Sequence, residues 1–394
     1  MKLATYTGAG SRIYPSGLQV GDVGIYTGDA RFVRLSDGIA FYGVSPTLTG
    51  AVLSDIGGHN STKMLVSRTD VGKFGADPEV LVVDGGGKVI PAWNFLPAKT
   101  GRIPETFWDG FQAEFTITPN ACISYVVDHI RGGLYDVYHA AKLYDANARL
   151  TSACVVQVDK KSLARMSPEH TALGCAPSLN VYPNTQQLQA DGRRLDLRFA
   201  GFHVHIGLGR MTEDEAMPIV KSIDQIAGVC SVAALGEIED SRRRIFYGRA
   251  GEYRLPEHGV EYRTLSAVGL AHPAVTSLLL TLVRIGICLA FTCPNALCSD
   301  AQAQDIINNN DVVTARSLVA KLGRQLTSWL KTDLVYSMAA TNAMQLITHG
   351  AHNLLDMDDI EGSWMLINGG WRPHAEAYGA SLKNTTLERL KPWL

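Results

Sequence analysis

The sequence predicts an α+β protein with a mostly antiparallel sheet, and three observations lead to that prediction. Short β-branched and aromatic runs are interleaved with long helical patterns, without the regular spacing of βαβ units. The hydrophobic fraction of 46% is sufficient for a sizeable core in a chain of 394 residues. Beyond residue 271 the pattern is almost wholly helical up to about residue 350.

The first 66 residues differ in composition from the rest of the chain. They are rich in Gly, Ser and Thr and contain short runs such as VGIYTG, RFVRL and IAFYGV between turn residues. We expect residues 1–66 to form a small β-rich accessory module with a docking or oligomerisation role, because they show no catalytic pattern. Residues 67–394 are then expected to form the main domain, with a helical C-terminal part.

Within the main domain the elements can be predicted in order. A hairpin is expected at 80–93, where VLVVD and VIPAW flank GGGK. Further strands are expected at 111–117, 152–158, 197–208 and 259–267. Amphipathic helices are expected over 120–150 and over 212–235, where TEDE resembles a capping box.

Composition excludes several classes of protein. The net charge of -2 and the lack of a basic tail argue against a nucleic-acid-binding protein. Seven cysteines without CxxC pairs fit a reducing compartment, and the N-terminus lacks the apolar run of a signal peptide, so we expect a cytoplasmic protein. The apolar segment 275–292 is long enough to cross a membrane, but Arg284 would disfavour insertion by roughly 2.5–3.5 kcal/mol. We therefore expect a core helix there.

Four expected strands each carry two polar side chains, two residues apart, amid Val, Ile, Phe and Leu. Residues two apart on a strand point to the same face. One such pair alone usually lies on a solvated face, but four pairs on neighbouring strands would converge on one site. The pairs are Asp77 and Glu79, Gln112 and Glu114, His203 and His205, and Glu261 and Arg263.

The residue types in these pairs indicate metal and oxyanion binding. Leaving carboxylates buried and unpaired would cost several kcal/mol each, a cost that a divalent cation removes. Oxygen ligands with an imidazole suit Mg²⁺ or Mn²⁺ better than a closed zinc site. Arg263 cannot bind a cation, and its planar guanidinium instead suits phosphate or carboxylate oxygens.

In chain order, GADPE, QAEF, GFHVHIG and GVEYRTLS resemble the successive active-site strands of the glutamine synthetase and glutamate–cysteine ligase superfamily. The resemblance is closer to the phage-type carboxylate–amine ligases (amidoligases), through RRRIFYGRAGEYRLPEHGVEYRTLSA at 242–267 and LGCAPSLNVYP at 173–183. It covers roughly residues 73–290 and leaves out the N-terminal module and the C-terminal hundred residues. It implies a glutamine synthetase-like funnel of antiparallel strands backed by helices, and ATP-dependent ligation of a carboxylate to an amine through an acyl phosphate.

The resemblance also implies two metal sites. Glu79 and Glu114 look like ligands of the metal nearest the acceptor, and Asp77, His203 and Glu261 like ligands of a metal between the ATP phosphates. Asp77 departs from the glutamate of better-known ligases, which shortens one arm. A further acidic ligand ahead of Glu114 is not clearly matched. Asp109 is the first candidate for it and Glu105 the second.

The basic residues would bind the nucleotide and the transferring phosphoryl group. The resemblance implies phosphate contacts from His205 and Arg263, and catalytic charge stabilisation by Arg249, Arg254 and Arg263. Arg244 is a further candidate for a nucleotide contact, because the short basic run at 242–244 could either meet phosphates or lie in solvent. ATP and Mg²⁺ or Mn²⁺ are the implied cofactors. The implied partners are small-molecule or peptide carboxylates and amines, in the host cytoplasm if the chain is phage-encoded, with no nucleic acid, no membrane and an open possibility of a homo-oligomer.

Two other functions stay open at this point. One is a catalytically silent structural or binding protein, such as a virion component, that keeps the ligase fold. The other is a metal-dependent hydrolase, although Arg249, Arg254 and Arg263 favour a polyphosphate substrate. Cys175 lies in a loop-like GCAPS segment and is expected to be inert.

Overall fold

The computed structural model describes five short strands between residues 2 and 55, and then residues 72–367 apart from 122, 164, 172–177, 183–190, 293–294, 296 and 334–336. The five strands form one antiparallel sheet in the order β4-β3-β2-β1-β5. They are β1 (Lys2–Thr5), β2 (Val23–Tyr26), β3 (Arg31–Arg34), β4 (Ala40–Tyr42) and β5 (Ser54–Asp55). The role of this segment, and the division of the chain at residue 66, stay predictions.

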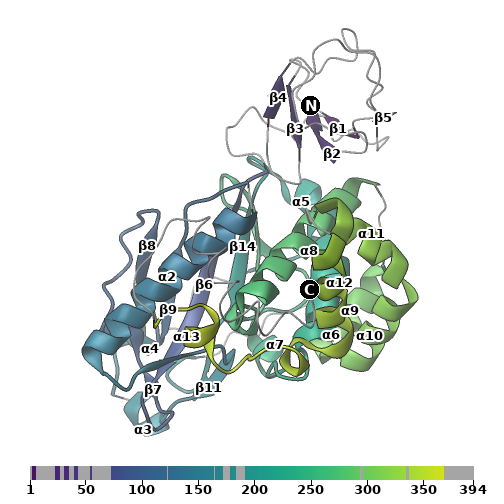
Figure 1. Cartoon of the computed structure of the whole chain (residues 1–394). Coiled ribbons are helices and arrows are strands. Elements are labelled where there is room, and N and C mark those ends of the chain that lie inside the picture. The colour runs from purple at the N-terminus through teal and green to yellow at the C-terminus, as the bar shows by residue number, and fades with distance from the viewer. Residues whose placement is uncertain are drawn as a thin grey trace.

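A nine-stranded antiparallel sheet forms the centre of the main part of the chain (Figure 1). Its order is β12-β15-β16-β14-β6-β9-β8, and β7 and β10 pair with the far end of β6. The strands are β6 (Phe74–Val83), β7 (Val89–Ile90), β8 (Glu105–Asp109), β9 (Gln112–Thr116), β10 (Arg149–Thr151), β12 (Leu179–Asn180), β14 (Phe202–Gly207), β15 (Glu252–Arg254) and β16 (Gly259–Tyr262). A separate two-stranded pair consists of β11 (Val155–Gln157) and β13 (Leu197–Phe199).

Helices cover the sheet and make up most of the C-terminal half (Figure 1). The α-helices are α2 (Ile123–Tyr144), α3 (Lys160–Leu163), α4 (Pro168–Thr171), α5 (Glu213–Ile223), α6 (Val229–Leu235), α7 (Arg243–Phe246), α8 (Pro273–Thr292), α9 (Asp300–Asn309), α10 (Val312–Lys321), α11 (Gly323–Asp333), α12 (Ser337–His349) and α13 (Ile360–Ser363). The short 3-10 helices are η2 (Ala92–Asn94), η4 (Ala267–Leu270) and η5 (Ala351–Asn353), and the π-helix η3 (Asp224–Gly228) joins α5 to α6.

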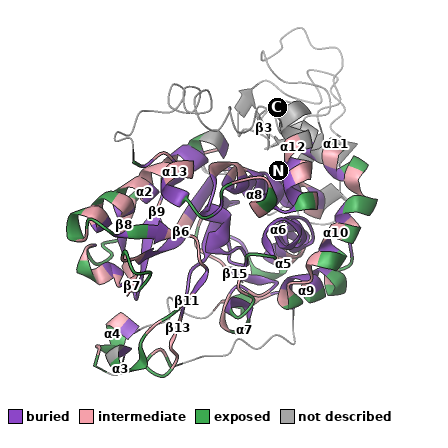
Figure 2. Cartoon of the chain, turned by 60° about the horizontal axis from the view of Figure 1, so that its bottom comes forward, coloured by how far each residue is buried: buried purple, intermediate pink, exposed green. Residues whose placement is uncertain are grey.

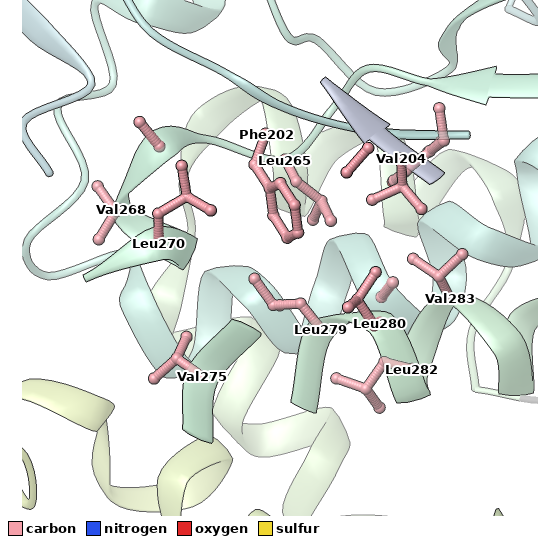
Figure 3. Packing of buried hydrophobic residues seen from close by; sticks show 14 of the residues in the cluster. Phe202, Val204, Leu265, Val268, Leu270, Val275, Leu279, Leu280, Leu282 and Val283 are labelled. Atoms are coloured by element: carbon pink, nitrogen blue, oxygen red, sulfur yellow. The ribbon is translucent and has the colours of Figure 1, made fainter. Parts of the chain in front are cut away.

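The alternation of residues along β14 explains how the sheet joins its helices. Phe202 and Val204 point to the side of α8 and pack among its leucines, as Figure 3 shows. His203 and His205 necessarily point to the opposite face. Buried residues gather on the sheet and the helices behind it, while the outer faces of α2, α9 and α10 carry exposed residues (Figure 2). One face of the sheet is thus committed to the core, which leaves the other for polar side chains.

The two most apolar helices are part of this core. The segment 213–235 and α8 are both long and apolar enough to span a membrane by length and composition, yet most of each is buried within the protein. Arg284 of α8 lies with its guanidinium over the Phe74 ring and donates a hydrogen bond to the Ala121 carbonyl. Its charge is therefore accommodated by contacts inside the fold, as the prediction of a core helix requires.

Much of the predicted order of elements is confirmed, including the α+β class. The hairpin pairs Val82 with Ile90, and Thr212 with Glu215 forms the expected capping box at the start of α5. The single strand expected at 197–208 is wrong. The strand is interrupted at Ala200 and Gly201, and β13 pairs with β11 while β14 enters the main sheet. The residues LGCAPSLNVYP, including Cys175, lie largely outside the described residues.

Leu279 offers a test of the core beneath β14. Its side chain is buried at the contact of α8 with Phe202 and η4 (Figure 3). Leu279→Ala removes buried methyl groups and leaves a cavity, so it should lower the free energy of unfolding by about 2–5 kcal/mol. Leu143→Ala makes the same change at a side chain of α2 that is 77% exposed, and urea unfolding should show a change below about 0.5 kcal/mol. Equal effects in the two variants would contradict the packing described.

Candidate active site

The strand order brings the predicted polar pairs onto one face of the main sheet. The strands that carry them, β16, β14, β6 and β9, are consecutive neighbours. In their registers His205 lies opposite Glu261, His203 opposite Asp77, and Glu79 opposite Glu114. Cross-strand partners lie on the same face of a sheet. The spacing of two residues therefore identified a real common face.

Glu79, Asp109 and Glu114 form an acidic cluster, a name used below for these three residues. One carboxylate oxygen from each lies within 4.8 Å of the other two, and Glu79 and Glu114 are almost completely buried. Asp109 reaches the cluster from the end of β8, which pairs with β9. Three convergent carboxylates supply the hard oxygen ligands that Mg²⁺ and Mn²⁺ prefer. The donor set of the acidic cluster therefore fits a divalent cation.

Burial and nearby charges disfavour the ionised forms of Glu79 and Glu114. Burial, opposed by Arg263 and reinforced by Asp109, raises the pKa of Glu79 to about 7. Burial and then the charge of Glu79 raise the pKa of Glu114 well above its usual value. The Gly201 N–H donates to Glu79 Oε2 at 2.6 Å and gives that carboxylate one compensating bond. Protons and a divalent cation would thus compete for the same oxygens.

Of the two candidates for a further acidic ligand, the structure brings Asp109 and not Glu105 to the acidic cluster. The Glu105 carboxylate instead accepts the backbone N–H groups of Thr100, Gly101 and Arg102, at 2.5, 2.8 and 3.1 Å. These bonds close the loop that precedes β8. Glu105 therefore shapes the loop, while Asp109 faces the other two acids.

His203 links the acidic cluster to the basic residues of the site. It is 2% exposed, and its Nε2 contacts the Tyr247 hydroxyl, which lies 3.3 Å from both carboxylate oxygens of Glu79. Its Nδ1 lies 3.7 Å from Glu261 Oε1 and 3.4 Å from an Arg263 nitrogen. Burial, followed by the charge of Arg263, lowers the pKa of His203 well below its usual value. The imidazole is therefore neutral at physiological pH, as a metal ligand must be.

His205 belongs to a different set of contacts from His203. Its Nε2 lies 3.1 Å from Asp77 Oδ2 and its Nδ1 lies 2.9 Å from His258 Nε2. Burial favours a neutral His205, but the hydrogen bond with Asp77 and the negative charges of Asp77 and Glu261 together outweigh it and raise the pKa of the imidazole. The structure thus places Asp77 beside His205, rather than grouping it with His203 and Glu261 as the metal prediction would have it. In the described residues Asp77 contacts His205, and His203 contacts Glu261.

The predicted arginines fall into two groups. Arg263 contacts Glu261 directly, and an Arg254 nitrogen lies 3.8 Å from the same carboxylate, so both face the site. Arg244 is buried, with Glu239 at 2.9 Å and a hydrogen bond to the Gly248 carbonyl, so its guanidinium is held inside the protein. Arg249 is half-buried in the loop between α7 and β15.

A buried polar contact on the helix side holds the end of β16. Tyr262 and Thr264 alternate with Glu261 and Arg263, so they point away from the site. The Tyr262 hydroxyl donates to Asp224 Oδ1 at 2.6 Å, and Asp224 belongs to the π-helix η3, the kind of irregularity often found near functional sites. This contact ties the strand that carries Glu261 to the helices behind it.

Three residues near the site were not predicted. Tyr247 and His258 lie inside the segment 242–267, but neither residue belongs to a spacing pattern that would mark it as part of a site. Lys99 lies 3.6 Å from Glu114 through its Nζ, and it comes from a loop without any pattern. The strand β8 was also missed, although both acidic candidates that it carries, Glu105 and Asp109, were named.

Comparison with protein families gives one match. Residues 180–366 match the model described as "Phage phiEco32-like COOH.NH2 ligase-type 2". The matched segment includes β14, β15 and β16, and it extends beyond residue 290, where the resemblance seen in the sequence was expected to end. The acidic cluster lies before it, on β6, β9 and β8, and of these strands β6 pairs directly with β14 of the matched part. No curated protein matches the chain.

The acidic cluster makes the stability of the metal-free protein depend on pH. Because the folded-state pKa of Glu79 is raised from 4.5 to about 7, the fold retains a proton that the unfolded chain loses. The contribution is fully present below about pH 4.5 and is lost as pH rises through about 7, which for a shift of this size is on the order of 3 kcal/mol. Glu114→Gln removes one of the repelling charges, so urea unfolding in EDTA from pH 5 to 8 should show a shallower decline than in the wild type.

The exposed Glu169 provides the control for this measurement. Glu169→Gln removes a carboxylate from α4 that lies outside the acidic cluster, and it should keep the wild-type pH dependence. The same slope in wild type and Glu114→Gln would show that the acidic cluster does not set the pH dependence.

Proposed function

Because residues 180–366 belong to the family of phage phiEco32-like COOH.NH2 ligases of type 2, we propose that this carboxylate–amine ligase works with ATP. A carboxylate oxygen is a poor leaving group, so a carboxylate must be activated before an amine can displace it. Transfer of the γ-phosphoryl group of ATP gives an acyl phosphate, from which the amine displaces inorganic phosphate. The proposed substrates are an amino acid, a peptide or a protein side chain on each side of the new bond.

The observation that supports this function best is the placing of acids and bases together on one sheet face. The acidic cluster suits a divalent cation, and Arg254 and Arg263 lie on the same face beside Glu261. Phosphoryl transfer requires both kinds of group, because negative charge is spread over the transferring oxygens. Neither a purely structural protein nor a simple hydrolase requires this combination.

Glu79, Asp109 and Glu114 would hold one divalent cation, and we propose Asp77, His203 and Glu261 as ligands of a second. Such cations supply Lewis-acid stabilisation of the charge on phosphoryl oxygens. Each acid of the second set already contacts a base, Asp77 with His205 and Glu261 with Arg263. If these acids bind a cation, His205 and Arg263 would become available to phosphate oxygens.

The protein's own groups then orient the reacting oxygens. The planar forks of Arg254 and Arg263 can each donate two parallel hydrogen bonds to phosphoryl oxygens. The Tyr247 hydroxyl and the Gly201 N–H hold Glu79 in place, and a Cβ on Gly201 would lie 2.6 Å from that hydroxyl. The role of Gly201 is therefore to let Tyr247 and His203 approach the strand closely.

One activity assay separates the proposed function from its alternatives. The full chain is incubated with ATP, Mg²⁺ or Mn²⁺ and panels of amino acids and short peptides, and phosphate release and amide formation are measured. A ligase should release phosphate only with a carboxylate and an amine together. Release without an amine would favour the hydrolase, and no release with any pair would favour a silent protein.

Arg254 supplies the sharpest variant for this assay. Its side chain is 23% exposed beside Glu261, so its replacement should leave the fold intact. Arg254→Met should slow product formation by a factor on the order of 10³, because charge on the transferring phosphoryl group loses its partner. Arg242→Met removes an exposed guanidinium that pairs with Asp240, and it should retain activity within about twofold. Unchanged turnover in Arg254→Met would remove this residue from the proposed mechanism.

Metal binding can be tested without any substrate. Mn²⁺ at a hundredfold excess over its Kd should stabilise the wild type by about 2.7 kcal/mol. At a fixed Mn²⁺ concentration the gain should be larger at pH 8 than at pH 6, because Mn²⁺ must displace the protons that the raised pKa values of Glu79 and Glu114 retain. Asp109→Asn should lose most of the gain in thermal unfolding, whereas Asp305→Asn, on the exposed face of α9, should keep it. An equal gain in both variants would place the bound metal elsewhere.

A further inference from the structure

Lys99 is a basic side chain beside the acidic cluster that has no role in the proposed reaction as described above. Its Nζ lies 3.6 Å from Glu114 Oε1 and 4.4 Å from the centre of the Phe107 ring. Phe107 lies opposite Glu114 in the register of β8 and β9, so the ammonium rests on the site face of the sheet. The Lys99 side chain is 49% exposed while that of Glu114 is only 4% exposed. Lys99 therefore lies on the solvent side of the acidic cluster.

Hydrogen bonds to β8 hold the loop that carries Lys99 in this position. Glu105 accepts three consecutive backbone N–H groups from Thr100 to Arg102, and the Trp108 N–H donates to the Pro97 carbonyl at 3.1 Å. The loop is thus fastened to β8 on both sides of Lys99. A lysine fastened in this way differs from one that merely reaches a carboxylate from a free surface.

The charges of the site show what this ammonium can do. The ionised acidic cluster carries a charge of -3 from Glu79, Asp109 and Glu114, which a divalent cation reduces to about -1. The ammonium of Lys99 brings the sum to about zero. Both the carboxylate to be activated and the phosphoryl group to be transferred are anions, and either would be repelled by a site with a residual negative charge.

We propose that Lys99 is an oxyanion-receiving residue of this site, which admits an anionic substrate group beside the metal-loaded acidic cluster. The proposal rests on the proposed function and names a contact that the family match does not supply, since Lys99 lies before residue 180. Without metal the ammonium is held by Glu114. If Glu114 binds a cation, the Lys99 ammonium would be available to the incoming oxyanion.

The inference predicts opposite effects of one substitution on cation and anion binding. Lys99→Met removes a positive charge near the acidic cluster, so Mn²⁺ alone should bind about 3- to 10-fold more tightly at low ionic strength. The Mn²⁺-loaded variant should bind an oxyanion about 3- to 10-fold more weakly than the loaded wild type. Lys99→Arg keeps the charge and should stay within about twofold of wild type in both measurements.

The experiment uses the full chain and three probes, namely Mn²⁺ alone, inorganic phosphate and acetate. Mn²⁺ affinity is measured by electron paramagnetic resonance, and each anion is titrated onto the Mn²⁺-loaded protein by calorimetry. Lys88→Met is the matched control, because Lys88 is an exposed lysine at the turn that follows β6. Weakening of phosphate alone would assign Lys99 to the phosphoryl group, and weakening of acetate alone would assign it to the donor carboxylate.

The outcomes separate this inference from the proposed function. Wild-type protein that binds no Mn²⁺ would overturn both. Wild-type protein that binds Mn²⁺, together with a Lys99→Met variant that binds both anions as the wild type does, would overturn the role of Lys99 alone. Equal losses in Lys99→Met and Lys88→Met would also overturn it, because the effect would then be one of net charge.

Discussion

The cross-strand pairing of Glu79 with Glu114 is the constraint on which the rest of the site depends. Two glutamates lie directly opposite each other on neighbouring strands, and both are almost fully buried. Like charges in this arrangement are destabilising, and burial makes each of them costlier. Proton uptake, the Gly201 N–H, the Tyr247 hydroxyl and the Lys99 ammonium are the partial compensations that the protein itself supplies. A divalent cation offers a fuller one.

The sheet can hold this arrangement because its other face is a conventional core. The same strands that carry acids and histidines on one side carry apolar or helix-facing side chains on the other. Phe202 and Val204 pack against α8 (Figure 3), and Tyr262 donates a hydrogen bond to Asp224 of η3. Hydrophobic burial on the helix side stabilises the fold and offsets the cost of the polar face. Stability and chemistry are thus separated by the alternation of side chains along each strand.

The sequence was informative wherever a local periodicity decides the structure. The spacing of Asp77 with Glu79 and of His203 with His205 predicted a shared face, and the sheet order confirms that the strands are neighbours. The capping residues of α5 and the hairpin after β6 were predicted for the same reason. The carboxylate–amine ligase family was also predicted from motifs, and the family model matches residues 180–366.

Features that depend on long-range packing could not be predicted. The need for glycine at position 201 depends on the close approach of Tyr247 and His203, where a Cβ would lie 2.6 and 2.7 Å from their side chains, and no local sequence pattern predicts that approach. Lys99 reaches Glu114 from a loop that the Glu105 carboxylate helps to close, and no sequence spacing encodes that contact. The burial of Arg244 against Glu239 likewise depends on how α7 packs, so its charge alone suggested a ligand contact that the packing directs inward.

Anomalous diffraction from a crystal soaked in Mn²⁺ tests most directly whether the acidic cluster is a metal site. An anomalous peak is expected among Glu79, Asp109 and Glu114, at a coordination distance of roughly 2.0–2.3 Å from an oxygen of each. The peak should disappear in Asp109→Asn crystals grown and soaked in the same way. Millimolar Mn²⁺ that gives no peak at these three residues, or a peak that survives Asp109→Asn unchanged, would contradict a metal site at the acidic cluster.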